Sequence, residues 1–232
     1  MINILNTKPE LILNGRLNYS LNYVDKNDLI NKRILNIGCG FGWFELNILK
    51  YDIDEAIGIE ITDKDLDVAK SNITNQKIKF EIGSAIDLPY EDNSFDTIVS
   101  WEVLEYIPKN TEIMMFKEIN RVLKNQGICY FSTPYKSFFS TVFDPAWWLI
   151  GHRHYSKKQL NDLLSSYSYE IQNITTIGKH WEIFSWWNLY IAKWIFRRDP
   201  FFDLYVKAKL DKEWSYSDDG YTNIFYKIKA LK

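Results

Sequence analysis

The chain has 232 residues, of which 46% are hydrophobic and 25% are charged. These values are ordinary for a globular protein, so they exclude a disordered chain, a collagen-like repeat and a small disulfide-stabilised scaffold. The 30 Asp and Glu residues nearly balance the 28 Lys and Arg residues, and the formal charge of -2 gives no general attraction to nucleic acid or anionic lipid.

The cysteines and the start of the chain predict the compartment. Cys39 and Cys129 are the only cysteines, and they lie far apart in the sequence. This suits a reducing compartment and does not provide a cysteine-based zinc site. The first residues lack a basic region followed by an apolar one, so we expect no signal peptide. No window of about 18 uncharged apolar residues predicts a membrane span, and we expect a cytoplasmic protein.

Strands and helices alternate along the first part of the chain. After a helical segment that carries Leu17, Leu21 and Val24, short apolar runs predict strands over 33–37, 56–60, 78–82, 95–100 and 128–133. Helical patterns lie between them over 43–50, from the cap Thr62 onward, and over 110–124, where 125–127 form a helix-ending turn. Beyond Pro134 the sequence predicts a helix over 156–165 and strands over 170–177 and 223–228. Such alternation is typical of a parallel sheet covered on both faces.

The segment Asn36-Ile37-Gly38-Cys39-Gly40-Phe41-Gly42 places glycines at alternate positions between a predicted strand and a helix. Glycines let the backbone turn sharply and approach a ligand, and the N–H groups of the helix start favour an anionic group. A dinucleotide fingerprint would need glycine at position 43, where Trp43 stands, so nicotinamide and flavin are disfavoured. Glu60 ends the next strand, where a carboxylate can accept hydrogen bonds from both hydroxyls of a ribose.

Further motifs follow the glycine turn. They are Gly58-Ile59-Glu60-Ile61, then 83–90, 94–99 and 118–127. Over residues 30–135 the sequence therefore resembles the class I S-adenosylmethionine-dependent methyltransferases of the methyltransferase-11 and ubiquinone O-methyltransferase type. The resemblance implies an α/β fold, a Rossmann-like three-layer αβα sandwich. Its seven-stranded, mostly parallel sheet has an antiparallel last strand, here Asn223–Ile228.

The resemblance also implies S-adenosyl-L-methionine as the cofactor and assigns binding roles by position. The implied cofactor-binding residues are Gly38, Cys39, Gly40 and Gly42 around the methionine part, Glu60 on the ribose, Ile61 and Ile86 on the two faces of the adenine, Ser84 and Ala85 at its edge, and Ser100 at the end of the fourth strand. Asn36 and Ser84 stand where the family usually or often has an acid, which predicts weaker cofactor binding than is typical.

Methyl transfer from a sulfonium is an in-line displacement, so the protein mainly aligns the acceptor and excludes water. A base is needed only where the acceptor must lose a proton. The site is expected at the carboxyl ends of the central strands, where Trp101 and Glu102 follow the fourth strand. Trp101 either walls the acceptor pocket or caps the core.

The segment Glu102-Val103-Leu104-Glu105-Tyr106 is similar to the Glu-x-x-Glu-His element of ubiquinone-pathway and small-RNA O-methyltransferases. That similarity implies Glu102 and Glu105 as candidate cation ligands. Tyr106 replaces the histidine, and because a neutral phenol is a poor ligand we predict no metal site unless His152 or His154 supplies the missing ligand. The two histidines alternate, so in an extended stretch they share a face and act as a base or acceptor clamp. A surface pair without function is the alternative.

Most tryptophans lie in the second half of the chain. Seven of the nine are Trp147, Trp148, Trp181, Trp186, Trp187, Trp194 and Trp214. They predict a lid over the acceptor or part of the core, a dimer contact, or a peripheral membrane contact. We expect a single domain over 1–232, with a cofactor-binding half over 30–135 and an acceptor cover over 136–156 and 179–220.

The sequence thus predicts an enzyme, an S-adenosylmethionine-dependent methyltransferase that O-methylates a small hydrophobic or glycosidic acceptor. One alternative is a non-catalytic scaffold that binds the cofactor without turnover. A second is an RNA methyltransferase, but the acidic balance disfavours it and we expect no nucleic acid partner.

Overall fold

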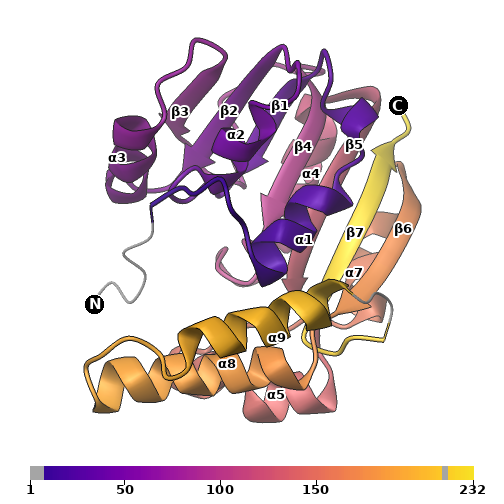
Figure 1. The fold of residues 1–232 in the computed structure, drawn as a ribbon. Coiled ribbons are helices and arrows are strands. Elements are labelled where there is room, and N and C mark those ends of the chain that lie inside the picture. The colour runs from indigo at the N-terminus through magenta and orange to yellow at the C-terminus, as the bar shows by residue number, and fades with distance from the viewer. Residues whose placement is uncertain (1–7, 216–218) are drawn as a thin grey trace.

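The computed structural model describes residues 8–215 and 219–232. The strands are β1 (Arg33–Ile37), β2 (Glu55–Glu60), β3 (Ile78–Ile82), β4 (Phe95–Trp101), β5 (Leu123–Pro134), β6 (Tyr169–Ile177) and β7 (Asn223–Ala230). They form a seven-stranded sheet in the order β3-β2-β1-β4-β5-β7-β6 (Figure 1). β7 runs antiparallel to β5 and β6, whereas β1 to β5 pair in parallel. The predicted α/β class and the antiparallel last strand are confirmed.

Helices cover both faces of the sheet and complete the predicted three-layer sandwich (Figure 1). One face carries α1 (Gly15–Tyr23), α2 (Trp43–Ile48) and α3 (Asp63–Asn72), and the other carries α4 (Glu112–Val122) and α7 (Lys157–Ser165). Each face has its own hydrophobic core. Because side chains alternate along a strand, Ile34 of β1 packs in the core under α1 and α2, and Leu35 packs in the core under α4 and α7. Burial on both faces explains why the predicted strands are nearly continuous apolar runs.

A further group of helices lies at the carboxyl end of the parallel strands. It consists of α5 (Phe138–Phe143), α6 (Pro145–Ile150), α8 (His180–Tyr190), a π-helical turn η2 (Ile191–Ile195) and α9 (Asp203–Ser215). In Figure 1, α5, α8 and α9 form a layer below the sheet, and α9 packs against α1. Within residues 8–215 and 219–232, no helix is long and apolar enough to cross a bilayer.

The predicted cover segments 136–156 and 179–220 contain this group of helices. Residues 216–218 of that cover lie outside the described residues. Residues 1–7 belong to the predicted single domain and to the region where we expect no signal peptide. They also lie outside the described residues. The division into a cofactor-binding half and a cover stays a prediction.

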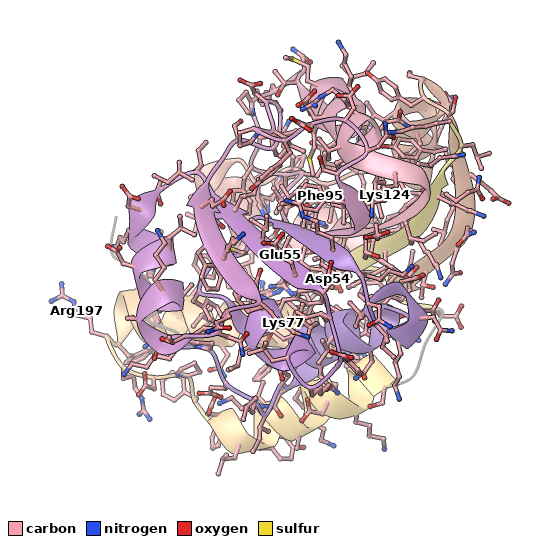
Figure 2. All side chains as sticks on the ribbon, turned by 90° about the horizontal axis from the view of Figure 1, so that it is seen from above. Asp54, Glu55, Lys77, Phe95, Lys124 and Arg197 are labelled. Atoms are coloured by element: carbon pink, nitrogen blue, oxygen red, sulfur yellow. The ribbon has the colours of Figure 1, made fainter. Side chains whose placement is uncertain are left out.

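Charged side chains lie at the amino ends of the parallel strands, on the side of the sheet opposite the helices α5, α8 and α9. Figure 2 looks down on this side, with Glu55, Phe95 and Lys124 near the centre of the view. Glu55 Oε2 accepts a hydrogen bond of 2.8 Å from Arg33 Nε, and Lys124 Nζ lies 2.9 Å from Asp96 Oδ2. These pairs lie at the amino ends of β1, β2 and β4. The pocket described below opens at the carboxyl ends of the same strands.

Predicted boundaries agree with the structure within two residues except after α4. β5 begins at Leu123, directly after the helix, rather than at position 128. Gln126 has a φ of 66°, and the register between β4 and β5 shifts between Phe95 and Thr97. The prediction that residues 125–127 form a helix-ending turn is therefore wrong, because strand pairing has already begun and the three residues form an irregular part of β5.

Candidate active site

The predicted glycine turn joins β1 to α2 at the carboxyl edge of the sheet. Gly38, Gly40 and Gly42 have φ values of 75°, 53° and 82°. A Cβ atom on Gly38 would lie 2.3 Å from Val103 Cγ2, whereas a Cβ atom on Gly40 would meet nothing within 4 Å. Packing therefore requires glycine at position 38, and the backbone at Gly40 faces open space that a ligand can approach closely.

A cavity of about 360 Å³ opens beside this turn. Its lining includes the predicted residues Gly38, Glu60, Ile61, Ser84, Ala85, Ile86, Trp101 and Glu102. Cys39 and Ser100 are buried next to lining residues. The Ile61 side chain is 70% exposed, although Ile59, two residues earlier on β2, is buried. An apolar side chain left open on a cavity wall is available to pack against a bound ligand.

The Glu60 carboxylate is held at the end of β2 by backbone donors. Gly40 N–H donates to Oε1 at 3.0 Å, and Ile61 N–H donates to Oε2 at 3.1 Å. The glycine turn itself is fixed to the same strand, because the N–H groups of Gly38 and Cys39 donate to the Ile59 carbonyl at 2.9 and 3.0 Å. The two parts of the predicted cofactor site are therefore directly connected.

Asn36 has a partner that the sequence analysis missed. Its Nδ2 donates a 2.8 Å hydrogen bond to Oε1 of Glu45, which α2 places beside β1. Glu45 is fully buried, and this burial raises the pKa of its carboxyl to about 7. An acidic group thus stands close to the position where Asn36 replaces the family's usual acid. A lone Glu between Phe44 and Leu46 in the short helix was the available signal.

Glu102 follows β4 with a φ of 55° and lines the pocket. Its Oε1 accepts from Ser132 Oγ at 2.6 Å, and its Oε2 accepts from Arg16 Nη1 at 3.1 Å and from Asn223 Nδ2 at 2.8 Å. Burial raises the pKa of the Glu102 carboxyl, and the Arg16 guanidinium opposes that rise. Arg16 comes from α1, some 86 positions away, so sequence spacing gave no sign of this pairing.

Trp101 lies in the core and also lines the cavity. It lines the pocket, yet only 8% of the residue is exposed. Its ring packs near Phe44 and Phe225, with centroids 6.2 and 5.9 Å away. Trp101 is therefore a core residue whose edge forms part of the cavity wall.

Glu105 has other hydrogen-bond partners than Glu102. Its Oε2 accepts from Thr133 Oγ1 at 3.0 Å, and its Oε1 lies 3.7 Å from His152 Nε2. Tyr106 lines the pocket, and its ring lies 5.2 Å from the His152 ring. The two glutamates of the predicted metal element thus have different partners, and Tyr106 connects the pocket with His152.

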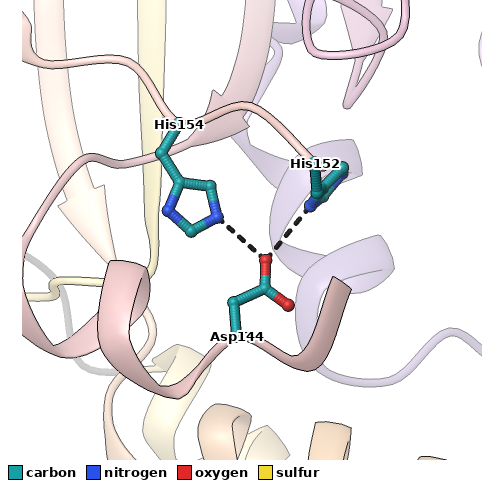
Figure 3. Close-up of side chains that lie close together, drawn as sticks. All are labelled: Asp144, His152 and His154. Atoms are coloured by element: carbon teal, nitrogen blue, oxygen red, sulfur yellow. Dashed lines mark hydrogen bonds and ion pairs between the residues drawn. The ribbon is translucent and has the colours of Figure 1, made fainter. Parts of the chain in front are cut away.

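His152 and His154 meet at Asp144, a residue that the sequence analysis did not single out. Figure 3 shows both imidazoles directed at one carboxylate oxygen. His154 Nε2 lies 2.8 Å and His152 Nδ1 lies 3.2 Å from Asp144 Oδ2. Burial disfavours the charged imidazole, but the contact with Asp144 and the nearby Glu105 carboxylate outweigh it and raise the pKa of His152 to about 9. Burial favours the neutral Asp144 carboxyl, but hydrogen bonds from His152, His154 and the Ala146 N–H outweigh it and lower the pKa of Asp144.

Comparison with known proteins finds relatives among methyltransferases. Residues 35–131 match the family model described as a methyltransferase domain. An uncharacterised methyltransferase of Schizosaccharomyces pombe is 34% identical over 119 residues, which are 47% of this chain and 41% of that protein. A ubiquinone biosynthesis O-methyltransferase of Pelagibacter ubique is 30% identical over 116 residues, which are 50% of this chain and 47% of that protein. The chain thus matches less than half the length of these relatives.

Solved structures show the same fold over nearly the whole chain. One of them is a complex between the Trm112 methyltransferase activator of Haloferax volcanii and a methyltransferase. The match covers 93% of this chain and 88% of that chain, with a TM-score of 0.66 and 17% identity. At this identity the likeness shows the fold alone.

Proposed function

This chain contains a class I S-adenosylmethionine-dependent methyltransferase domain, and we propose that it methylates an oxygen of a small hydrophobic or glycosidic acceptor. The observation that carries the proposal is the continuous cavity from the glycine turn and Glu60 to Trp101 and Glu102. S-adenosylmethionine, the methyl donor of this domain family, supplies an electrophilic methyl group when it is bound. The protein then has to bind, orient and shield the acceptor.

The residues present fit this cofactor. We assign the methionine part to Gly38, Cys39, Gly40 and Gly42 with Ser100 behind them, the ribose to Glu60, and the adenine to Ile61, Ser84, Ala85 and Ile86. The open backbone at Gly40 and the exposed side chain of Ile61 support this assignment. The Glu60 carboxylate is already aligned by two backbone N–H groups, so little ordering is needed on binding.

On the acceptor side we assign the wall to Trp101 and a polar contact to Glu102. Arg16 and Ser132 hold the Glu102 side chain in place, so the carboxyl can orient an acceptor hydroxyl without moving. His152 and His154 lie beyond Tyr106, and the raised pKa of His152 disfavours it as a general base. We therefore propose that the two histidines fix the segment beyond Tyr106 through their contacts with Asp144 and do not remove a proton.

The apolar surface beside this pocket is the basis for the acceptor class. On α8 and η2, exposed side chains recur at helical spacing and form one face. They are Phe184, Trp187, Ile191, Trp194 and Ile195. Trp187 Nε1 donates to the Phe143 carbonyl at 2.9 Å, which joins this face to exposed Phe138, Phe139 and Phe143 on α5. A surface with this many exposed apolar side chains favours an acceptor with a large apolar part.

We further infer that this surface rests on a lipid membrane that holds the acceptor. Arg197 and Arg198 directly follow the exposed Ile195 and Phe196, and Figure 2 shows Arg197 projecting from the rim of the molecule. Aromatic side chains flanked by arginines match an anionic membrane interface. Cosedimentation with anionic vesicles is the measurement. A stable dimer that buries Trp194, or an absence of vesicle binding, contradicts this inference.

Calorimetric titration with S-adenosylmethionine tests the cofactor site. Glu60→Ala removes a charged hydrogen-bond acceptor, so the affinity is expected to fall about 10- to 100-fold. Asp67→Ala removes an exposed carboxylate from α3 and is the matched control, with unchanged affinity expected. Equal binding by Glu60→Ala and wild type contradicts the assignment.

Methyl transfer to a panel of phenols, sugar hydroxyls and amines tests the reaction. We expect products methylated on oxygen, with apolar phenols as the best acceptors. Transfer to amines alone contradicts the proposed acceptor class. Tight cofactor binding without transfer to any acceptor favours the scaffold alternative, and salt-dependent binding of RNA favours the nucleic acid alternative.

A further inference from the structure

We propose that Asp144, His152 and His154 bind a divalent transition-metal ion of the zinc type. This site is separate from the proposed cofactor pocket and does not depend on the proposed methyl transfer. It also differs from the Glu102 and Glu105 pair that the sequence offered as candidate cation ligands. The three side chains come from the start of α6 and from the segment that follows it (Figure 3).

The ligand atoms are close to the spacing that a metal ion needs. The Asp144 oxygen and one nitrogen from each histidine all lie within 4.8 Å of one another. The two nitrogen-to-oxygen distances are 2.8 and 3.2 Å. Ligands on a tetrahedral ion with bonds of about 2.0 to 2.1 Å stand roughly 3.3 Å apart. The two nitrogen-to-oxygen distances thus lie within about half an ångström of the spacing on such an ion.

The surrounding chain fixes these ligands in advance. Asp144 Oδ1 accepts a 2.8 Å hydrogen bond from Ala146 N–H at the start of α6, which leaves Oδ2 directed at the histidines. Next to His154, Tyr155 N–H donates to the Pro134 carbonyl at 3.0 Å and joins the segment to the end of β5. The ligands thus keep their positions without the ion, which lowers the ordering cost of binding.

A metal-bound histidine usually donates its second N–H to a neighbouring acceptor, which we call its outer partner, and Glu105 can be that partner of His152. His152 directs Nδ1 at Asp144, and its other nitrogen, Nε2, lies 3.7 Å from Glu105 Oε1. Both atoms are buried and have no hydrogen-bond partner among the described residues. Metal-bound histidines commonly donate their second N–H to a carboxylate. A bound ion would place the proton on Nε2, where Glu105 can accept it.

Charge and donor type favour a transition metal over Mg²⁺ or Ca²⁺. Asp144 and Glu105 bring two carboxylates into a largely buried site, and a divalent ion balances them. Two imidazoles and one carboxylate suit zinc or iron, whereas Mg²⁺ and Ca²⁺ prefer oxygen ligands. Three protein ligands also leave a position for water or another small ligand.

Titration of the metal-free protein with Zn²⁺, and with Co²⁺ followed by its visible absorption, tests the proposal. We expect one ion per chain. Asp144→Asn keeps the oxygen that caps α6 but removes the charge, so stoichiometric binding is expected to be lost. Glu105→Gln alters only the outer partner and is expected to lower the affinity about 10- to 100-fold. His180→Gln removes the third histidine of the chain, on α8, and should bind as the wild type does.

Urea unfolding of each variant shows whether its fold is intact. Because the metal is measured without cofactor or acceptor, failure of this site and failure of the proposed methyl transfer are distinguishable. Absence of saturable Zn²⁺ binding overturns the proposal. Binding that survives both Asp144→Asn and Glu105→Gln also overturns it, because the cluster would then be a hydrogen-bonded group only.

Discussion

The two halves of the chain hold their functional side chains in different ways. In the segment 30–135, the backbone positions the predicted cofactor-binding residues, since Glu60 is fixed by two N–H groups and the glycine turn by the Ile59 carbonyl. Beyond position 135, side chains position one another, as Asp144 does for the two histidines. The first arrangement depends on the backbone of a recurring pattern, and the second depends on hydrogen bonds between individual side chains. A substitution should therefore have different consequences in the two halves.

The largest effect is expected at Gly38. Alanine there would have to adopt a positive φ and would bring its Cβ atom within 2.3 Å of Val103 Cγ2. Backbone strain and overpacking together should cost about 3 to 5 kcal/mol of unfolding free energy. Urea unfolding of Gly38→Ala measures this cost.

Gly151→Ala is the matched control in the second half. Gly151 also has a positive φ, of 70°, but an added Cβ atom would meet nothing within 4 Å. Only the backbone cost of about 1 to 2 kcal/mol is expected. If both substitutions lower the unfolding free energy equally, the close contact between position 38 and Val103 contributes nothing to the requirement for glycine there.

The same contrast explains what the sequence could predict. The order of strands, the glycine turn and Glu60 are local patterns. The strand order is confirmed by the structure, and Gly38 and Glu60 line one cavity. The sequence did not predict Arg16 beside Glu102 or Asp144 between the histidines. Arg16 and Glu102 are 86 positions apart in the sequence. Asp144 lies only 8 and 10 positions from the histidines, but it belongs to no motif that marks them as its partners.

The next largest effect is a pH dependence caused by Glu45. Its pKa is raised from 4.5 to about 7 in the folded protein, so the folded state holds the proton more tightly than the unfolded chain does. Stability from this group is complete below pH 4.5 and falls as the pH rises to 7. A shift of this size corresponds to about 3 kcal/mol. Urea unfolding at several pH values should show the decline in wild type.

Glu45→Gln should remove most of that decline, because the amide stays neutral across the range. It also keeps an oxygen that can accept from Asn36 Nδ2. Asp67→Asn, an exposed position on α3, should leave the wild-type profile unchanged. If Glu45→Gln retains the full decline, another group is responsible and the acid beside Asn36 is ionised in the folded protein.

The smallest effect on stability is expected on the apolar surface of η2. Trp194 and Ile195 are 53% and 70% exposed, so changing both to Ser should alter the unfolding free energy by only about 0.5 kcal/mol. Trp214→Ser is the contrasting variant, because Trp214 is buried and donates to Glu182 Oε2 at 2.9 Å; a loss of about 3 to 5 kcal/mol is expected.

Affinity for anionic vesicles should fall about tenfold or more in the Trp194→Ser, Ile195→Ser variant. If that variant instead loses several kcal/mol while vesicle binding persists, this surface is packed within an oligomer, and the second half of the chain depends on its own fixed contacts as strongly as the first.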